Sequence, residues 1–267
     1  MTWRILKVLT CISGLSMTLS ASTLDVNICH GCNISQALQP LTQMPLEQLR
    51  HQAQAITVKV ISKEFLGSGI LLGKQGKVYT VLTNAHVLRA GNPPYRIQTA
   101  DGRMYTANLP QKIRFQGHDL AILQFKSSSY IYGVAVLGAS PNVGDQVFAT
   151  GFPFAQEGTK ENRLMFTTGK VSLVLDKALE GGYQVGYTNN IAKGMSGGPL
   201  LNRRGEVVGI NGLHAYPLWD APSVFIDGLE ADERLHQMIN RLSWAVPMDK
   251  VVKMIPKAVN YRFSGVK

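Results

Sequence analysis

A chain of 267 residues, 45% of them hydrophobic, is long enough to bury one large core or two small ones. Only 16% of the residues are charged, glycine is frequent at 26 residues, and no low-complexity run occurs, which argues against a disordered chain and against a helical bundle. The net charge is +10, but the basic residues form no stripe with interleaved aromatics, which argues against nucleic-acid binding. Attraction to acidic partners or anionic surfaces stays open.

The first 21 residues have the pattern of a secretory signal peptide. Arg4 and Lys7 precede an apolar stretch from Val8 to Leu19, and small residues follow it. We therefore predict that residues 1–21 are removed, that the protein is secreted or periplasmic, and that no stable membrane anchor remains after cleavage. The alternative is an uncleaved anchor, although the stretch is short and rich in Ser and Thr for a membrane span.

Residues 22–54 form a polar, Gln-rich N-terminal extension. In an oxidising compartment, the close spacing of Cys29 and Cys32 favours a local disulfide. Free thiols or a metal site are the alternatives, although a metal site would lack a fourth ligand of matching spacing. Near the end of the extension, LEQLRHQAQ predicts a short helix that opens with Pro45 at its first position.

From Ala55 onward the sequence changes to short segments that are β-branched or alternating, most of them bounded by Gly, Asn, Asp or Pro. Ten such segments, at a spacing of roughly 8–15 residues, predict an antiparallel all-β protein, either a sandwich or barrels. In chain order they are AITVKVIS, SGILLG, KVYTVLT, YRIQTA, RMYTANL, DLAILQF, QVFATGF, RLMFTTGKVSLV, YQVGYT and GEVVGING. Later, GLEADERLHQMINRL favours a surface helix and MDKVVKMIPKAV a closing amphipathic helix.

The stretch KGMSGGPL places Ser196 among three glycines, which suits either a tight turn or an exposed nucleophile. It also satisfies the G-x-S-x-G pattern of α/β-hydrolases. That fold needs a helix after the serine, whereas PLLNRRGEVVGING predicts a strand, a turn and a strand. It also needs an acid (Asp220, Asp227 or Asp232) and then His236, only 40 residues after the serine, which is too short for the remaining units of that fold.

Two upstream residues fit a serine triad better. His86 directly follows a buried-looking strand in VYTVLTNAHVL, and Asp119 begins an apolar strand in GHDLAILQF. The order His, Asp, Ser on an all-β background is a known order for such a triad. His86 would act as general base and acid, Asp119 would orient it, and Ser196 would attack a carbonyl. The backbone N–H groups of Gly194 and Ser196 would form the oxyanion hole, and no metal or organic cofactor is needed.

Other polar residues nearby have ordinary structural explanations. His118 is a rival base, but adjacent residues of a strand face opposite ways, so we expect it to point to solvent. Asp101 and Asp145 lie in DG and GD turns. We expect Thr83 and Asn84 to hold the histidine turn.

TNAHV, HDLAIL and GMSGGPL resemble the three active-site motifs of trypsin-like (chymotrypsin-fold) serine proteases. The HtrA/Deg-type bacterial branch is the nearer likeness, since ITVKVI, GSGILL, GFPF, TTGKVSLV, EVVGING and SWAVPMDKVVKMI are similar to it over about residues 52–257. The resemblance implies two antiparallel Greek-key β-barrels, with short N- and C-terminal helices and the active site in the cleft between the barrels. We expect residues 55–140 to form the first barrel with His86 and Asp119, residues 141–258 the second with Ser196, and residues 259–267 a tail.

The chain also departs from these families. Many HtrA-type enzymes carry a PDZ domain, and we expect none after residue 257. Residues 214–240 look longer than the HtrA/Deg branch needs between its last strands, so we expect an insertion there. Met195 stands where trypsin has the aspartate that pairs with a new N-terminal amine, so that form of activation is not expected. Asn190 aligns with the acidic specificity residue of trypsin, which indicates a neutral pocket. Its predicted substrate-binding residues are Asn190, Ile191, Asn211, Gly212 and Leu213.

The sequence therefore predicts an exported serine endopeptidase that hydrolyses protein or peptide substrates through an acyl-enzyme. One alternative is an esterase or other acyl hydrolase with the same triad. The other is a latent protease-fold protein that binds peptides.

Overall fold

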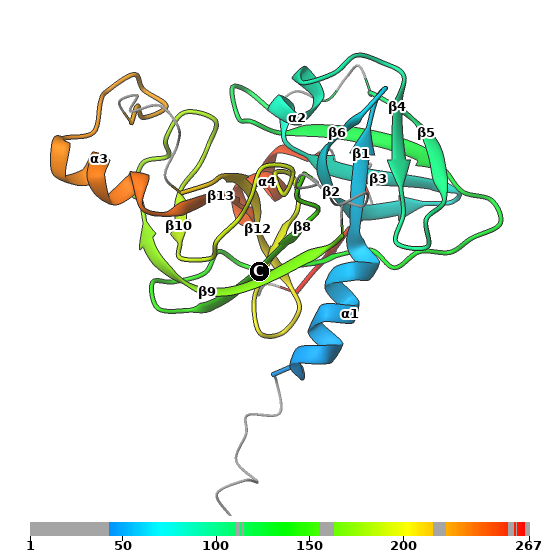
Figure 1. Cartoon of the computed structure of the whole chain (residues 1–267), viewed down its shortest axis with the longest axis horizontal. Helices are drawn as coiled ribbons and strands as arrows, with labels where there is room; N and C mark the ends of the chain where they lie inside the picture. Colours follow the sequence, from blue (N-terminus) through cyan, green and yellow to red (C-terminus); the bar gives the residue numbers. More distant parts are fainter. Residues whose placement is uncertain are drawn as a thin grey trace, which may run out of the picture. The chain divides into compact units, whose positions relative to one another are not determined.

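The structure is a computed structural model, and it describes residues 43–110, 113, 115–154, 163–215, 223–255, 259 and 261–264. The predicted signal peptide and the predicted Cys29–Cys32 disulfide lie outside these residues. Strands make up most of the regular structure, which confirms the predicted all-β class (Figure 1). The helices and strands are α1 Leu46–Ile56, β1 Thr57–Ile61, β2 Phe65–Gln75, β3 Val78–Thr83, α2 Ala85–Arg89, β4 Tyr95–Gln98, β5 Met104–Asn108, β6 Ala121–Lys126, β7 Val136–Leu137, β8 Gln146–Gly151, β9 Met165–Val174, β10 Val185–Tyr187, β11 Pro199–Leu201, β12 Val207–Leu213, α3 Glu233–Asn240, β13 Ser243–Pro247, α4 Met248–Met254 and β14 Arg262–Phe263.

The first barrel contains β1 to β6 and closes in the order β1-β2-β3-β6-β5-β4, with every neighbouring pair antiparallel. Side chains alternate along its strands, as the pleat of a β-strand requires. On β2, Leu71 packs in the barrel interior with Tyr79 and Val81, whereas Ile70 and its neighbour Leu72 belong to a separate cluster outside it. Strand β2 is therefore apolar on both faces, which explains the apolar run ILL in its sequence.

The second barrel repeats this strand order with β8 to β13. The order is β8-β9-β10-β13-β12-β11, and pairing of β11 with β8 closes the ring. The short strand β7 adds to β12 in parallel, and β14 adds to β7 in parallel. In both barrels the fourth strand returns beside the first, which is the Greek-key path. The prediction of two antiparallel Greek-key barrels is therefore confirmed.

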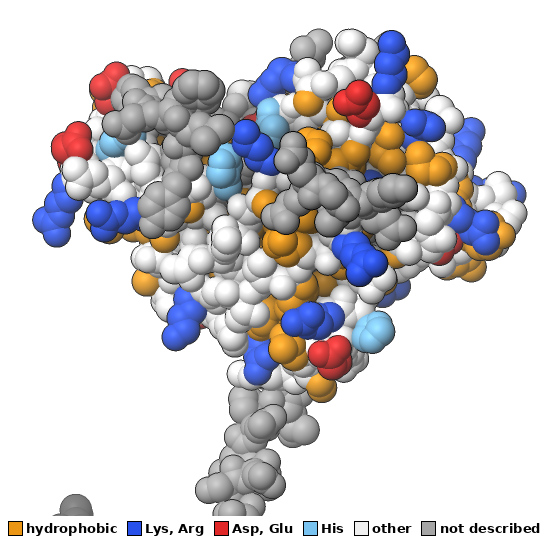
Figure 2. Space-filling model, viewed as in Figure 1, with side chains coloured by type: hydrophobic (Ala, Val, Ile, Leu, Met, Phe, Trp, Pro, Cys, Tyr) orange, Lys and Arg blue, Asp and Glu red, His pale blue; other side chains and the backbone are white. Residues whose placement is uncertain are grey.

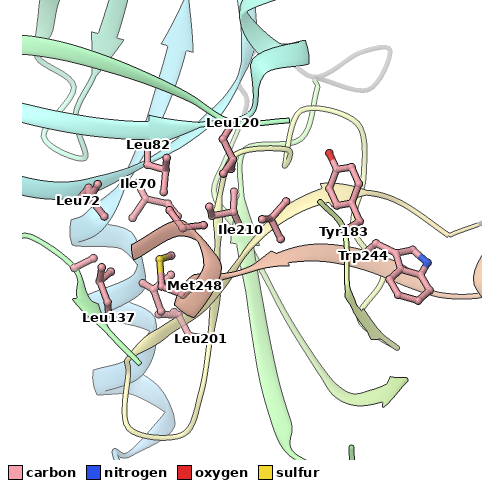
Figure 3. Packing of buried hydrophobic residues seen from close by; sticks show 14 of the residues in the cluster. Ile70, Leu72, Leu82, Leu120, Leu137, Tyr183, Leu201, Ile210, Trp244 and Met248 are labelled. Atoms are coloured by element: carbon pink, nitrogen blue, oxygen red, sulfur yellow. The ribbon is translucent and has the colours of Figure 1, made fainter. Parts of the chain in front are cut away.

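A large apolar cluster joins the two barrels. Ile70, Leu82 and Leu120 approach from the first barrel, and Ile210 and Trp244 from the second (Figure 3). All five side chains are almost fully buried. Since a buried aliphatic or aromatic side chain contributes about 1.5–3 kcal/mol, this cluster fixes one barrel against the other and with them the two halves of the site.

Helix α1 covers one side of the joint cluster. Leu49, Ala53 and Ile56 lie one helical turn apart and are all buried in it. The side chain of Gln52 also donates a hydrogen bond of 2.6 Å to the carbonyl of Gly205 in the second barrel. The helix was predicted to begin with Pro45 at its first position, but Pro45 is the capping residue with extended ψ and the helix begins at Leu46.

The part of the predicted 214–240 insertion that the structure describes contains α3. Asp232 caps this helix, because its carboxylate accepts the N–H of Leu235 at 2.9 Å. None of the helices in the described ranges has the length and apolar character needed to cross a membrane. Lys and Arg side chains are scattered over the visible face in Figure 2 and do not gather into one stripe.

Candidate active site

His86 and Asp119 meet at the edge of the first barrel. The Nδ1 atom of His86 lies 2.5 Å from Oδ2 of Asp119, and the backbone N–H of His86 donates to Oδ1 at 2.8 Å. His86 lies on α2, a single short helix that follows β3 and that the sequence had suggested only as a turn. Two bonds from one residue to both carboxylate oxygens fix the direction of the imidazole, with Nδ1 occupied and Nε2 left for a reacting group.

Asn84, directly after β3, bonds to the backbone of Asp119, and Thr83, at the end of β3, bonds to β2. The side chain of Asn84 donates to the carbonyl of Asp119 at 2.8 Å, and the hydroxyl of Thr83 donates to the carbonyl of Ser68 at 2.7 Å. Both residues are fully buried. Their predicted structural role corresponds to these two hydrogen bonds to backbone carbonyls. Asp119 itself lies just before β6 rather than within it.

Asp119 is held in its ionised form. Burial alone would raise the pKa of its carboxyl group, but the hydrogen bonds and charge of His86 and the hydrogen bond from Tyr183 outweigh burial, so the pKa lies below its ordinary value. The guanidinium of Arg89, 3.5 Å from Oδ1, adds a further positive charge. A charged carboxylate next to Nδ1 is what stabilises an imidazolium.

The predicted orientation of His118 toward solvent is wrong. It does not point freely to solvent, since it is half-buried, its Nδ1 lies 2.9 Å from the carbonyl of Phe115, and its ring covers Gly182. The strand rule failed because His118 lies in the turn before β6, where side chains do not alternate. Asp101 lies in the turn after β4, where it accepts hydrogen bonds from Thr99 and Tyr132.

Ser196 lies on a sharply bent elbow between the barrels. Gly197 has a φ of +84°, and a Cβ atom there would lie 2.2 Å from the carbonyl oxygen of Ser68 on β2. The N–H of Ser68 donates to the carbonyl of Ser196 at 2.9 Å. Only glycine permits this close approach of the two backbones. Among the described residues, the hydroxyl of Ser196 donates to the carbonyl of Gly212 at 3.1 Å rather than to His86.

The loop before Ser196 is held in an open shape by Ser68 and Phe154. The N–H of Phe154 donates to the carbonyl of Lys193 at 2.9 Å, and the hydroxyl of Ser68 donates to the carbonyl of Gly194 at 2.8 Å. The N–H and C=O of a trans peptide point in opposite directions, so the N–H of Gly194 is turned away from Phe154. Gly194 has a φ of +96°, and a Cβ there would lie 2.6 Å from the carbonyl oxygen of Phe152.

Met195 anchors the same loop by burial. Its side chain is 0% exposed and packs with Ile191, Leu200 and Val208 inside the second barrel. Its sulfur lies 3.4 Å from the N–H of Ala192. Apolar packing thus occupies the position where trypsin has a charged aspartate.

His86, Asp119 and Ser196 line one cavity of about 520 Å³ between the barrels. Of the predicted substrate-binding residues, Ile191, Gly212 and Leu213 line this cavity. Asn190 and Asn211 are not in its lining, since Asn190 is exposed elsewhere and Asn211 is fully buried with its side chain bonded to Thr150, Pro199 and Tyr187. His214 also lines the cavity, and burial followed by the charge of Lys193 lowers its pKa.

Sequence reasoning gave no role to Ser68 and Tyr183. Ser68 lies within GSGILL, where the small residues permit close backbone approach, and this was the available signal. Tyr183 lies in an ordinary alternating segment, and nothing in its sequence context indicates that its hydroxyl reaches Asp119.

Two barrels with a His–Asp pair on one and a serine elbow on the other define the trypsin-like class. The family model described as a trypsin-like peptidase domain matches residues 67–210. The chain belongs to this family, and its domain is similar to those of HtrA/Deg-type serine proteases.

Similar proteins agree with this assignment. Serine protease HTRA1 of Xenopus tropicalis is 29% identical over 211 residues, covering 74% of this chain and 37% of that protein. The periplasmic pH-dependent serine endoprotease DegQ of Escherichia coli (strain K12) is 36% identical over 149 residues, covering 55% of this chain and 31% of that protein. The chain thus spans about a third of the length of these relatives.

Two solved structures show the same fold. The HtrA-type protease AlgW with a decapeptide matches with a TM-score of 0.58 at 20% identity, covering 79% of this chain and 66% of that one. The serine endoprotease from Yersinia pestis matches with a TM-score of 0.56 at 22% identity, covering 79% and 65% of the two chains.

Proposed function

We propose that this protein is a serine endopeptidase that cleaves protein or peptide substrates through an acyl-enzyme. The observation that carries the proposal is the Nδ1–Oδ2 contact of 2.5 Å between His86 and Asp119, in the same cavity as the Ser196 elbow. Names of relatives such as DegQ, a serine endoprotease, support the peptide substrate class.

In the acylation step, Ser196 Oγ attacks the scissile carbonyl carbon. The hydroxyl first turns from the Gly212 carbonyl toward the cavity by rotation about χ1, a change between staggered rotamers. His86 Nε2 takes the hydroxyl proton as the new C–O bond forms, and the carbonyl π electrons move to its oxygen. Asp119 stays ionised and stabilises the imidazolium.

The tetrahedral oxyanion is stabilised by the N–H groups of Gly194 and Ser196. Ser68 and Phe154 hold the loop in advance, so these donors need no rearrangement during the reaction. His86 then gives its proton to the leaving amine as the C–N bond breaks. Water repeats the sequence on the acyl-enzyme, with His86 again as base, and releases the acid and the free serine.

The lining of the cavity supports a neutral side chain of the substrate next to the scissile bond. Ile191, Ala192 and Leu213 contribute apolar surface to the cavity, whereas Asn190, which aligns with the specificity aspartate of trypsin, does not line it. Export through residues 1–21 is part of the proposal, supported by their sequence pattern and by the periplasmic location in the name of DegQ.

One observation favours a second candidate, a latent protease-fold protein that binds peptides. In the described residues, the Ser196 hydroxyl is engaged by Gly212 and not by His86. Hydrogen bonds between catalytic groups are often long or misaligned without substrate, so this geometry is compatible with activity as well.

A fluorophosphonate probe separates the two candidates. We expect covalent labelling of Ser196 in the folded wild-type protein, no labelling of Ser196→Ala, and a loss of roughly 10⁴-fold or more in peptide turnover by this variant. A folded wild-type protein that neither labels nor cleaves a peptide library would show the latent form. Labelling together with turnover of esters but not of peptides would show an esterase.

A further inference from the structure

The second barrel reaches across to the first beside the His86–Asp119 pair. Gly181 forms a parallel bridge with His118, and its carbonyl accepts the N–H of Asp119 at 2.8 Å. Gly181 and Gly182 both have positive φ, at +78° and +86°. The N–H of Leu179 closes this turn by donating to the carbonyl of Tyr183 at 2.8 Å. The turn therefore fixes the backbone position from which the Tyr183 side chain extends.

Tyr183 uses this position to reach the carboxylate. Its side chain is 3% exposed, and its hydroxyl donates to Asp119 Oδ2, the same oxygen that faces His86 Nδ1. Figure 3 shows the ring with its hydroxyl oxygen on the side away from Trp244. Burial and then the charge of Asp119 raise the pKa of the phenol, so the group remains a donor at neutral pH.

Gly212 leaves the space that the tyrosine ring fills. A Cβ atom at Gly212 would lie 2.1 Å from Cε1 and 2.3 Å from the hydroxyl oxygen of Tyr183. The carbonyl of the same glycine accepts the hydroxyl of Ser196. The ring therefore lies directly between the strand edge beside the nucleophile and the carboxylate of the first barrel.

We propose that Tyr183 is a positioning residue that fixes Asp119, and through it His86, from the second barrel, and that position 212 is glycine because the tyrosine ring occupies the place of its side chain. This inference rests on the proposed function and names a further residue of the same site. It makes the first barrel's acid dependent on a hydroxyl of the second barrel.

Loss of the Tyr183 hydroxyl would change the charge on the Asp119 carboxylate in one direction. The groups that face the Asp119 carboxylate are His86 and Arg89 from α2 and Tyr183 from the second barrel, while His118 turns its Nδ1 to a backbone carbonyl. Removing the phenol hydroxyl leaves more negative charge on Oδ2 for the imidazolium. The carboxylate, with one donor fewer, is also less firmly oriented toward the imidazole.

The test is Tyr183→Phe, which keeps the ring and removes only the hydroxyl. We expect kcat for a peptide substrate to fall about 10-fold, as for loss of a hydrogen bond to a charged group, with KM changed by less than about twofold. The acid limb of the kcat/KM profile should move to higher pH. Tyr132→Phe is the matched control, because it removes a tyrosine hydroxyl from Asp101, outside the cavity, and should leave kcat and the profile unchanged.

Coupling and spectroscopy separate positioning from a merely structural effect. In an Asp119→Asn background, Tyr183→Phe should cause no further loss in the rate of fluorophosphonate labelling. The far-downfield proton signal of His86 Nδ1, assigned by its absence from Asp119→Asn, should shift in Tyr183→Phe. Gly212→Ala, which displaces the ring but keeps the hydroxyl, should shift the same signal and serves if Tyr183→Phe does not fold.

Wild-type kcat, pH profile and proton signal in folded Tyr183→Phe would overturn the inference, as would an equal loss in the Asp119→Asn background. Failure of the proposed function would look different, since the wild-type protein itself would neither label nor cleave. In that case the proton signal still tests the Tyr183–Asp119 contact.

Discussion

The two barrels have the same strand order but hold their parts of the site in different ways. In the first barrel, His86 and Asp119 hold each other through two hydrogen bonds, and Asn84 from the same barrel adds a third. In the second barrel, the loop carrying Ser196 is held by its own barrel, through buried Met195, and also by the first barrel, through Ser68. The His–Asp pair is thus held within one barrel, whereas the elbow that carries Ser196 depends on both barrels.

The dependence also runs the other way at one point. Gly181 and Tyr183 of the second barrel hold Asp119 by its N–H and by its carboxylate. Each barrel therefore supplies reacting groups and also fixes those of the other. A site built in this way is complete only when the joint apolar cluster has formed, which links activity to docking of the barrels.

The largest expected effect concerns how the second barrel holds its own loop. Met195→Asp places a carboxylate where the side chain is 0% exposed among apolar residues. We expect the free energy of unfolding to fall by about 3–5 kcal/mol, as for an uncompensated buried charge, with loss of fluorophosphonate labelling. Urea unfolding measures the change.

Met195→Leu is the control for volume at this position, with an expected cost below about 1.5 kcal/mol and labelling retained. Wild-type stability in Met195→Asp would mean that a cationic partner reaches this site, and the apolar anchor would then be wrong.

The second prediction tests the hydrogen bonds by which Ser68 of the first barrel holds the second barrel. Its hydroxyl accepts the N–H of Phe152 at 2.8 Å and donates to the carbonyl of Gly194 at 2.8 Å. Ser68→Ala removes both bonds, so we expect kcat to fall about 10- to 100-fold as the oxyanion donors lose their fixed positions. Steady-state kinetics on a peptide substrate measure it.

Ser62→Ala removes another buried serine hydroxyl of the first barrel, one that donates to the carbonyl of Asn92 away from the loop, and should leave kcat unchanged. Equal kcat values for Ser68→Ala and wild type would show that the second barrel holds Gly194 without help from the first.

The smallest effect is an acid dependence of the second barrel. Burial alone would raise the pKa of Glu206, but hydrogen bonds from Arg204, Ser264 and Asn202 outweigh burial and place the pKa below its ordinary value of 4.5. A depressed pKa stabilises the folded state fully above the unfolded pKa, and the contribution is lost as pH falls through the folded pKa.

Glu206→Gln should therefore reduce the free energy of unfolding by less than about 1 kcal/mol at pH 7, because Arg204 is largely exposed, and should weaken the loss of stability on acidification. Urea midpoints at neutral and acidic pH measure both. If the acid dependence is unchanged in Glu206→Gln, Glu206 does not cause the loss of stability at low pH. Asp119 in the first barrel, whose pKa is also lowered, would then be its main cause.

Much of the fold and the reacting residues could be predicted from the sequence. Alternating apolar segments gave the all-β class because a strand places successive side chains on opposite faces. The motifs around His86, Asp119 and Ser196 identified candidate residues because a serine nucleophile needs a base and an acid to orient it. The failed expectation for His118 arose where a turn replaced the regular strand.

By itself the sequence determined the period of the strands, the glycines of the elbow and the three residue types of the site, since these follow from local backbone and chemical requirements. Only the tertiary structure decided which residues hold that site. Ser68 lies 126 positions from Gly194, and Tyr183 lies 64 from Asp119, so neither contact leaves a local pattern in the chain. Such contacts form only when two closed barrels pack their apolar faces together, and the space left at Gly212 has meaning only beside the ring that fills it.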